Sequence, residues 1–144
     1  MEQVFTYERS PYYYETDRMN VIHHSNYIRW FEEARIYFMK QVGFPYDKME
    51  SIGIMMPVLS AECHYKNSVK FGDTVLIDTA ISFFNGFKME IQYKIYDKET
   101  GEIRAYGNTS HCFTDMQMKP LRIKKTHPEI FEIFDKVSPT YLFK

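Results

Sequence analysis

Three side chains that can act in acid–base or nucleophilic chemistry, Asp17, His23 and His24, lie within a span of eight residues. They fall between a predicted strand and a predicted helix that begins near Asn26. The N-terminus of a helix presents unpaired N–H groups and about half a positive charge, so it can stabilise an oxyanion on an ester or thioester carbonyl. A carboxylate just upstream can reach the same carbonyl, either as a nucleophile or as a general base that activates water. The spacing therefore makes Asp17 the candidate catalytic carboxylate.

Residue type alone does not decide between this chemistry and a structural role. An aspartate in a loop ahead of a helix is more often a turn or capping residue, and a histidine pair there is more often a surface feature. We interpret Glu15 and Glu32 as ordinary solvated acids.

A long helix must hold the site on one side. From Asn26 onward, apolar residues recur at spacings of three and four, which predicts an amphipathic helix of about 16 residues. Ser25 or Asn26 is expected to be its N-cap, because either side chain can accept a hydrogen bond from the first free amides. Gly43 supplies a left-handed stop, and Pro45 prevents continuation. The apolar face of this helix is bulky and consists of Tyr27, Ile28, Trp30, Phe31, Ala34, Tyr37, Phe38 and Met39.

The rest of the chain is predicted to form five strands and one short helix. Asn85-Gly86 is the strongest hairpin signal and predicts a type I′ turn. The strand after it alternates apolar with polar residues, which predicts one wet face. The long helix and the largely antiparallel sheet must bury their apolar faces against each other, so we predict a single α+β domain over residues 1–144, with a curved five-stranded sheet wrapped around one central helix. The predicted strands are residues 3–14, 54–65, 74–84, 87–95 and 103–115, and the final helix covers residues 128–136.

Composition argues against several classes of protein. With 18 basic and 19 acidic residues the formal net charge is −1, so we expect no nucleic-acid partner. No stretch approaches the roughly 18 apolar residues of a membrane span, and the N-terminal segment has no apolar signal-peptide core, so we expect a cytoplasmic protein. Cys63 and Cys112 are expected to be small buried thiols rather than a disulfide framework. The five histidines lack a convincing metal-ligand spacing, so we expect no metal and no other cofactor.

The aromatic content is high, with 12 Tyr, 12 Phe and one Trp. Aromatic side chains are enriched at subunit interfaces and in apolar ligand pockets. A large interface, a ligand channel and an aromatic-rich core are all compatible with these numbers.

Three segments resemble the signatures of one known family. The first runs from Tyr14-x-x-Asp17 to Asn26-Tyr27-x-x-Trp30-Phe31-Glu32-x-Ala34-Arg35, the second is Tyr65-x-x-Ser68-Val69-x-Phe71-Gly72-Asp73, and the third is Lys119-Pro120. Together they resemble the hot-dog-fold acyl-CoA thioesterases, specifically the 4-hydroxybenzoyl-CoA thioesterase group and the related short-chain acyl-CoA thioesterases. The resemblance implies a hot-dog fold and hydrolysis of an acyl-CoA thioester to a free carboxylic acid and CoA.

The same resemblance implies roles for individual residues. Asp17 falls on the catalytic carboxylate, and the backbone N–H of His24 falls on the donor that polarises the thioester carbonyl, with the His24 side chain assisting. Glu32 and Arg35 fall on a polar pair of the helix, which we interpret as a salt bridge. The helix residues expected to line the acyl pocket or the dimer core are Asn26, Tyr27, Trp30 and Phe31. The basic residues expected to contact the phosphates of CoA are Lys66, Lys70, Lys119 and Arg122.

Members of the family pair two subunits edge to edge, with each active site at their interface, so the resemblance implies a homodimer or a homotetramer. Two departures from the family pattern concern local geometry. Asn20 stands where the family usually has Gly, and Asn tolerates the left-handed conformation better than other non-glycine residues. Ser68 stands where the family often has Pro, which leaves that loop freer.

Three alternatives to an acyl-CoA hydrolase stay open on the sequence. An acyl-ACP thioesterase differs only in its carrier protein and needs an electropositive docking patch, for which the net charge gives no support. A catalytically silent, acyl-binding hot-dog oligomer is disfavoured because Asp17 is retained at its spacing. A hydratase on this fold needs a different Asp/His pairing and ranks last.

Overall fold

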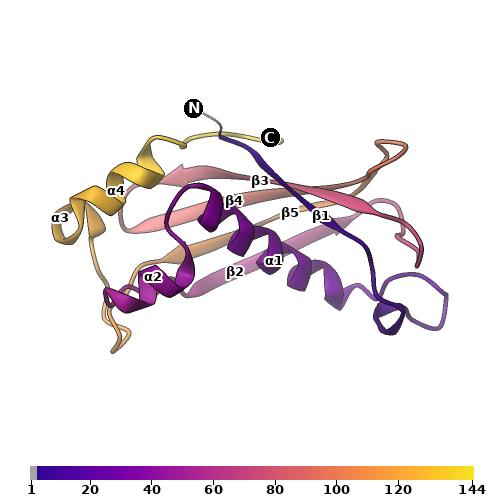
Figure 1. Cartoon of the computed structure of the whole chain (residues 1–144), viewed down its shortest axis with the longest axis horizontal. Coiled ribbons are helices and arrows are strands. Elements are labelled where there is room, and N and C mark those ends of the chain that lie inside the picture. The colour runs from indigo at the N-terminus through magenta and orange to yellow at the C-terminus, as the bar shows by residue number, and fades with distance from the viewer. Residues whose placement is uncertain (1–2) are drawn as a thin grey trace.

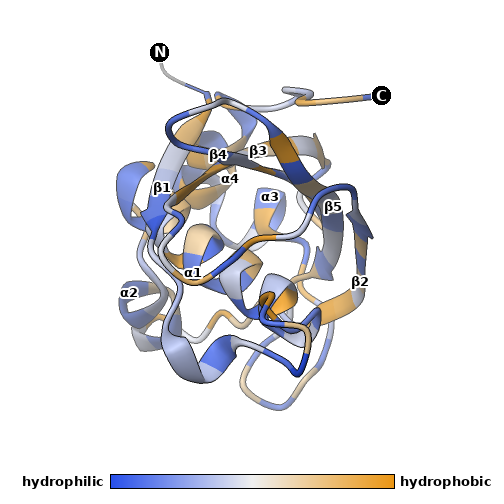
Figure 2. Ribbon diagram, turned by 90° about the vertical axis from the view of Figure 1, so that its right-hand side faces the viewer, coloured by the Kyte–Doolittle hydropathy of each residue, from blue (hydrophilic) through white to orange (hydrophobic). Residues whose placement is uncertain are grey.

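The computed structural model describes residues 3–144 and contains a five-stranded antiparallel sheet. The sheet curls around a long helix, α1 (Ser25–Gln41), which lies against its concave face (Figure 1, Figure 2). The order across the sheet is β1-β3-β4-β5-β2, so β1 and β2 are its two edges. The predicted fold class, a curved five-stranded sheet around one long helix, is confirmed. The strands are β1 (Phe5–Arg9), β2 (Val58–Tyr65), β3 (Val75–Phe84), β4 (Lys88–Asp97) and β5 (Ile103–Cys112).

Short helices mark the two ends of the sheet. A 3-10 helix, η1 (Tyr13–Glu15), precedes the turn that carries Asp17. We call this the site end, because the loops at residues 16–24 and 66–74 meet there (Figure 1). The opposite end, which we call the α4 end, carries α2 (Tyr46–Ser51), α3 (Ile123–Thr126) and α4 (Pro128–Asp135).

The core lies between α1 and the sheet. Phe31 projects from α1 and stacks on Tyr93 of β4, with ring centroids 4.4 Å apart and planes inclined by 11°. Gly107 of β5 makes room for this packing, because a Cβ at that position would lie 2.9 Å from the Phe31 ring and 2.0 Å from the backbone oxygen of Glu62. Trp30 and Phe38 are likewise fully buried. The bulky face predicted for the helix is therefore mostly core, which fixes α1 firmly on the sheet.

The β3–β4 hairpin forms where it was predicted, but its turn type is different. A type I′ turn needs a positive φ at both central residues. Gly86 has φ = 90°, whereas Asn85 is not among the described residues with positive φ. The Asn85 side chain instead accepts hydrogen bonds from the amides of Phe87 and Lys88 at 2.9 and 2.8 Å. The prediction of a type I′ turn was wrong, because this local side-chain contact makes a longer loop.

Three strands are shorter than predicted by three residues or more, and one of them is β5, which ends at Cys112 instead of Asp115. β1 ends at Arg9, because Pro11 has no N–H to donate and the chain then turns into η1. β2 begins at Val58, after Pro57. The wet face predicted for β4 is also partly covered: Gln92 is 7% exposed and accepts a hydrogen bond from the Leu142 amide at 2.7 Å, so the C-terminal segment crosses the sheet there.

β2 is an edge strand with most of its surface uncovered. Every residue from Val58 to Tyr65 is exposed except Cys63, which is half-buried. Cys112 on β5 is half-buried too, so the prediction that both thiols are buried was wrong within this chain. An edge strand of eight residues presents a row of unpaired backbone groups that can pair with another chain.

Candidate active site

The segment from Glu15 to His23 folds back on itself as a short antiparallel ladder. His23 N–H donates to Glu15 O at 2.8 Å, and Asp17 N–H donates to Val21 O at 2.8 Å. Asn20 closes the turn with φ = 64°, so the left-handed conformation expected there is confirmed. Asp17 therefore stands at the start of a tight turn that packs beside the N-terminus of α1.

The Asp17 carboxylate is held by its own turn. Its Oδ1 atom accepts hydrogen bonds from Met19 N–H at 2.7 Å and from Val21 N–H at 3.4 Å. No hydrogen bond from residues 3–144 reaches its Oδ2 atom. One carboxylate oxygen is fixed by the backbone, and the other is left for a ligand.

α1 begins one residue earlier than predicted, and its start is not capped by a side chain. Neither Ser25 nor Asn26 is the N-cap; that residue is His24, which makes no side-chain capping bond. The Asn26 amide group points backward and donates to Glu15 O at 3.1 Å. In the described part of the chain, the backbone N–H of His24 has no hydrogen-bond acceptor. The helix start thus offers an unpaired donor at the positive end of its dipole.

Asp17 and His24 line the same pocket, which has a volume of about 250 Å³. Tyr27 from α1, Tyr65 from the end of β2 and Lys66 contribute to its walls. The rings of Tyr27 and Tyr65 meet edge to face with centroids 5.0 Å apart. The structure therefore brings together four residues singled out from the sequence: Asp17, His24, Tyr27 and Lys66.

Tyr65 was not singled out as a site residue, although it opens the second signature segment. Its hydroxyl donates to His24 O at 3.2 Å. Burial raises the pKa of Tyr65 to about 12, so the phenol stays protonated and remains a donor at neutral pH. Burial also raises the pKa of Cys63 to about 11, so this nearby thiol is protonated and a poor nucleophile.

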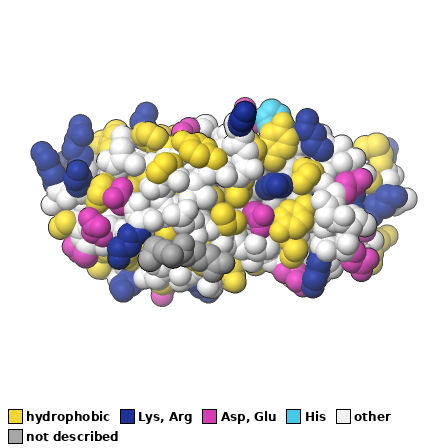
Figure 3. Space-filling model, turned by 90° about the horizontal axis from the view of Figure 1, so that it is seen from above, with side chains coloured by type: hydrophobic (Ala, Val, Ile, Leu, Met, Phe, Trp, Pro, Cys, Tyr) yellow, Lys and Arg dark blue, Asp and Glu magenta, His cyan; other side chains and the backbone are white. Residues whose placement is uncertain are grey.

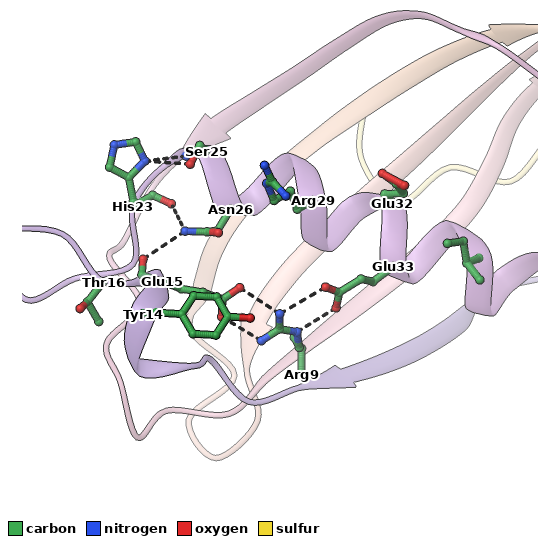
Figure 4. Close-up of a pocket in the computed structure, with 11 residues that line it drawn as sticks. Arg9, Tyr14, Glu15, Thr16, His23, Ser25, Asn26, Arg29, Glu32 and Glu33 are labelled. Atoms are coloured by element: carbon green, nitrogen blue, oxygen red, sulfur yellow. Dashed lines mark hydrogen bonds and ion pairs between the residues drawn. The ribbon is translucent and has the colours of Figure 1, made fainter.

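A second and larger hollow, of about 660 Å³, lies on the other side of the helix start (Figure 4). Arg9 from β1 sits at its floor between two carboxylates. Its guanidinium donates to both oxygens of Glu15 at 2.9 Å and to Glu33 at 2.8 Å. Trp30 Nε1 completes the cluster with a hydrogen bond to Glu15 at 3.2 Å. These contacts lock η1, β1 and α1 together.

The interpretation of Glu15 as a solvated acid was wrong, because its side chain is only 4% exposed. Burial opposes its ionisation, but the hydrogen bonds from Arg9, the Tyr12 amide and Trp30 outweigh burial and hold the pKa of Glu15 below its usual range. The backbone oxygen of Glu15 accepts from His23 and Asn26. Glu15 therefore anchors the ladder that carries Asp17, a role that a solvated acid would not have.

The predicted salt bridge between Glu32 and Arg35 does not form among the described residues. Glu32 is exposed, whereas Arg35 is 7% exposed and turns inward. It donates to the hydroxyls of Tyr46 and Tyr93, each at 3.0 Å. The salt-bridge prediction failed because the helix position of Arg35 faces the sheet and α2 rather than solvent.

The remaining predicted residues are divided between the two ends of the molecule. Lys70 is exposed at the site end, where its backbone pairs with Val21. Lys119 and Arg122 are exposed. Arg122 is the N-cap of α3 and Lys119 lies in the loop before it, so both belong to the α4 end, whose helices lie at the opposite end of the sheet from the loop at residues 16–24 (Figure 1). Lys and Arg side chains gather at that end on the face seen in Figure 3. Asn26 borders the larger hollow, and Trp30 and Phe31 are fully buried in this chain.

Two further observations concern ligands and membranes. Across residues 3–144, no group of three or more His, Cys, Asp or Glu side chains is arranged to hold a metal ion. Nor is any helix in that range both long and apolar enough to cross a membrane.

A curved five-stranded antiparallel sheet wrapped around one long helix is the hot-dog fold. Residues 13–135 match the thioesterase-like superfamily, and the chain belongs to that family. It is 34% identical over 125 residues to the Bacillus subtilis protein YneP, which is provisionally named an acyl-CoA thioesterase; the match covers 86% of this chain and 90% of YneP.

Solved structures give the same result for the fold. The crystal structure of a DHNA-CoA thioesterase from Staphylococcus aureus is 32% identical, with a TM-score of 0.88 and coverage of 93% of this chain and 90% of that one. The 4-hydroxybenzoyl-CoA thioesterase from Pseudomonas sp. strain CBS-3 is 15% identical, with a TM-score of 0.77 and coverage of 90% and 99%, which is a likeness of fold alone. The family resemblance drawn from the three signature segments is confirmed.

Proposed function

We propose that this protein hydrolyses acyl-CoA thioesters to a free carboxylic acid and CoA, with Asp17 as the catalytic carboxylate. The observation that carries the proposal is the pocket at the start of α1, which Asp17 and His24 both line. Membership of the thioesterase-like superfamily and the names of the relatives at 32–34% identity support the reaction type. The Asp17 carboxylate and the unpaired N–H of His24 line one pocket, which supports their roles as catalytic carboxylate and oxyanion donor.

The geometry supports two versions of the chemistry. In one, the Asp17 oxygen without a hydrogen bond attacks the thioester carbon, CoA thiolate leaves, and water hydrolyses the resulting anhydride. In the other, the same oxygen takes a proton from a water molecule, which attacks the carbon directly. In both, the negative charge that develops on the carbonyl oxygen is stabilised by His24 N–H and the positive end of α1.

The side chain of His24 has a secondary role in this proposal. Its ring stacks on His23 with centroids 4.3 Å apart, and it lies beside Tyr65 at the pocket wall. An imidazole there can assist proton transfer to the leaving thiolate, whereas the oxyanion contact is made by the backbone. Removal of the ring should therefore reduce the rate less than removal of the Asp17 charge.

The thiol carrier has cations available at the pocket mouth. Lys66 lines the pocket and Lys70 lies beside it, and phosphate groups are held by such point charges. Lys119 and Arg122 lie at the α4 end and can take part only if a second chain brings its α4 end to this pocket. An antiparallel two-fold pairing of β2 with its copy does that, because it sets the site end of one chain beside the opposite end of the other.

We therefore include a homodimer through β2 in the proposal. Val58, Leu59 and Tyr65 are 51%, 53% and 48% exposed on this edge, which is high for apolar residues in a strand. Pairing through β2 would bury them and extend the sheet across two chains. A homotetramer would then form by pairing of two such dimers.

The test is an assay of purified protein on a panel of acyl-CoAs, with a thiol reagent to detect free CoA. Asp17→Asn keeps the shape of the side chain but can neither attack nor accept a proton, so the rate should fall at least ~10²-fold. Asp135→Asn, an exposed aspartate of α4, is the matched control and should behave as the parent. Equal activity of Asp17→Asn and the parent would overturn the site assignment. Acyl-ACP substrates in the same assay distinguish the two carriers.

A further inference from the structure

The loop at residues 66–74 is the second support of the Asp17 turn. Ile22 N–H donates to Val69 O at 2.8 Å, and Val21 pairs with Lys70 as an isolated bridge. The turn that carries Asp17 is therefore hydrogen-bonded to this loop through Ile22 and to Glu15 through His23. A shift of the loop would act on the Asp17 turn through the Ile22–Val69 hydrogen bond and the Val21–Lys70 bridge.

The same loop also forms part of the pocket wall. Lys66, Asn67 and Ser68 line the pocket that contains Asp17. Ser68 has no ring, so the backbone here lacks the restriction on φ that a proline would impose. Another feature of the fold must hold the loop if it is to keep Asp17 in place.

Arg104, near the start of β5, supplies that restraint. Its guanidinium donates to Ser68 O at 3.1 Å and lies 3.6 Å from the Asp73 carboxylate, so it contacts the loop on both sides of Val69. The Arg104 backbone oxygen also accepts from the amides of Lys66 and Asn67 at 2.8 and 3.0 Å. One residue thus grips the loop through its side chain and its main chain.

The guanidinium is itself anchored to the sheet. It donates to Asp97 at 3.0 Å and to Glu102 at 2.6 Å, and its side chain is 14% exposed. Asp97 also accepts hydrogen bonds from the amides of Thr100 and Glu99. The hydrogen bonds from the Thr100 amide and from Arg104 hold the pKa of Asp97 below its usual range. Asp97 therefore stays ionised near neutral pH, and Arg104 is fixed in one orientation by the β4–β5 hairpin.

We propose that Arg104 is a positioning residue for the hydrolase: it clamps the 66–74 loop, and through Val69 and Ile22 it fixes the Asp17 carboxylate against the start of α1. The inference rests on the proposed role of Asp17. Because displacement of a catalytic group by about 1 Å can lower the rate on the order of 10²-fold, loss of the clamp should reduce kcat roughly 10- to 100-fold. Arg104 does not line the pocket and is not a catalytic residue.

The experiment compares Arg104→Gln with the parent by three measurements: kcat and KM on one acyl-CoA, amide hydrogen exchange, and the melting temperature. We expect kcat to fall roughly 10- to 100-fold, with faster exchange at the Ile22 amide, whose acceptor is in the clamped loop. Exchange of the Ile91 amide in the centre of β4 should not change. Asp97→Asn combined with Arg104→Gln removes both charges and serves if the single variant folds poorly.

The matched control is Glu102→Gln, which removes an exposed partner of Arg104 and leaves Ser68, Asp73 and Asp97 in contact; its kcat should equal that of the parent. Parental kcat in Arg104→Gln, or slower turnover with unchanged Ile22 exchange, would overturn the inference. Equal acceleration of exchange at Ile22 and Ile91 would overturn it too, since that pattern means general unfolding. If Asp17→Asn were fully active, the proposed function would fail first, so the two failures are distinguishable.

Discussion

The hydroxyl of Tyr65, at the last residue of β2, donates a hydrogen bond to the backbone oxygen of His24, at the first turn of α1. This contact ties the edge strand to the helix start across the mouth of the pocket. It fixes the orientation of the peptide that follows His24, and so supports the neighbouring amide proposed to bind the oxyanion.

Replacement of Tyr65 by Phe should lower kcat and should leave the fold largely as stable as in the parent. The variant keeps the ring and loses a single hydrogen bond worth about 1 kcal/mol, which corresponds to roughly a fivefold fall in kcat if the bond supports the transition state. Steady-state kinetics and thermal unfolding measure the two effects. Tyr141→Phe, at a residue 67% exposed, is the control. Unchanged kcat in Tyr65→Phe would show that the contact is only structural.

Replacement of Glu15 by Gln should destabilise the fold and impair the site together. The change leaves Arg9 buried with only Glu33 as an ionic partner and weakens the anchor of the Asp17 ladder. We expect a loss of about 2 kcal/mol in the free energy of unfolding, as for charged hydrogen bonds in a buried site. Urea titration measures it.

The control for Glu15 is Glu8→Gln. Glu8 pairs with Lys98 at 2.8 Å, but both side chains are about half exposed, at 54% and 50%. An exposed pair contributes at most about 1 kcal/mol. Equal losses in the two variants would contradict the structural role given to Glu15.

The stability of the protein should fall as the pH drops below neutrality, and His111 should be one cause. Burial and the charge of Arg35 lower the pKa of His111 to about 4, from 6.5. Between these values the unfolded chain binds a proton that the folded chain does not, so stability is present above pH 6.5 and is lost as the pH falls toward 4. The shift corresponds to about 3 kcal/mol.

Unfolding free energies at pH 7 and pH 4.5 for the parent and His111→Gln test this prediction. The drop between the two pH values should be smaller in the variant, whereas His64→Gln, at a residue 48% exposed, should retain the parental drop. Glu15 adds to the loss at still lower pH, because its pKa is also held below the ordinary value. An identical drop in His111→Gln and the parent would contradict the assignment.

Gly107→Ala should destabilise the core. The added methyl group would lie 2.0 Å from the backbone oxygen of Glu62 and 2.9 Å from the ring of Phe31, so β2 or α1 must move. Overpacking of this kind costs about 1–3 kcal/mol or more. Thermal unfolding measures the effect, with Asn108→Ala on the opposite face of β5 as the control. A Gly107→Ala variant as stable as the parent would show that the helix is not held as closely to β5 as the structure has it.

Leu59→Glu should weaken the proposed dimer and leave the chain folded. Leu59 is 53% exposed on β2, so a charged side chain is tolerated in the monomer but is buried when two β2 edges pair. Light scattering after size exclusion should give a dimer or tetramer for the parent and a smaller species for the variant. Ile52→Glu, at a residue 42% exposed outside β2, is the control. A monomeric parent would contradict the assembly.

The site could be predicted as far as its residues act locally. Asp17, the left-handed Asn20 and the start of the helix are separated by few positions, so turn chemistry and helical spacing place the turn ahead of the helix without knowledge of the rest of the fold. The helix nevertheless begins one residue earlier than predicted, with His24 as its N-cap. The hairpin at Gly86 was located for the same reason. Its turn type was not, because the side chain of Asn85 competes for the amides of the loop.

What the sequence by itself determined is the α+β order of elements, the long apolar helix and the carboxylate ahead of it, since these follow from periodicity and from residues close in the chain. Only the tertiary structure decided that Glu15 is buried against Arg9, that Arg35 turns from Glu32 to two tyrosines, and that Arg104 grips the loop beside Asp17. Tyr93 and Ser68, the partners of Arg35 and Arg104, are distant in sequence, whereas Arg9 and Glu15 are close in sequence but are buried together with Trp30 and Glu33 of α1. Burial decides whether a charged side chain meets water or a partner. The spacing of residues along the chain does not indicate which charged side chains become buried.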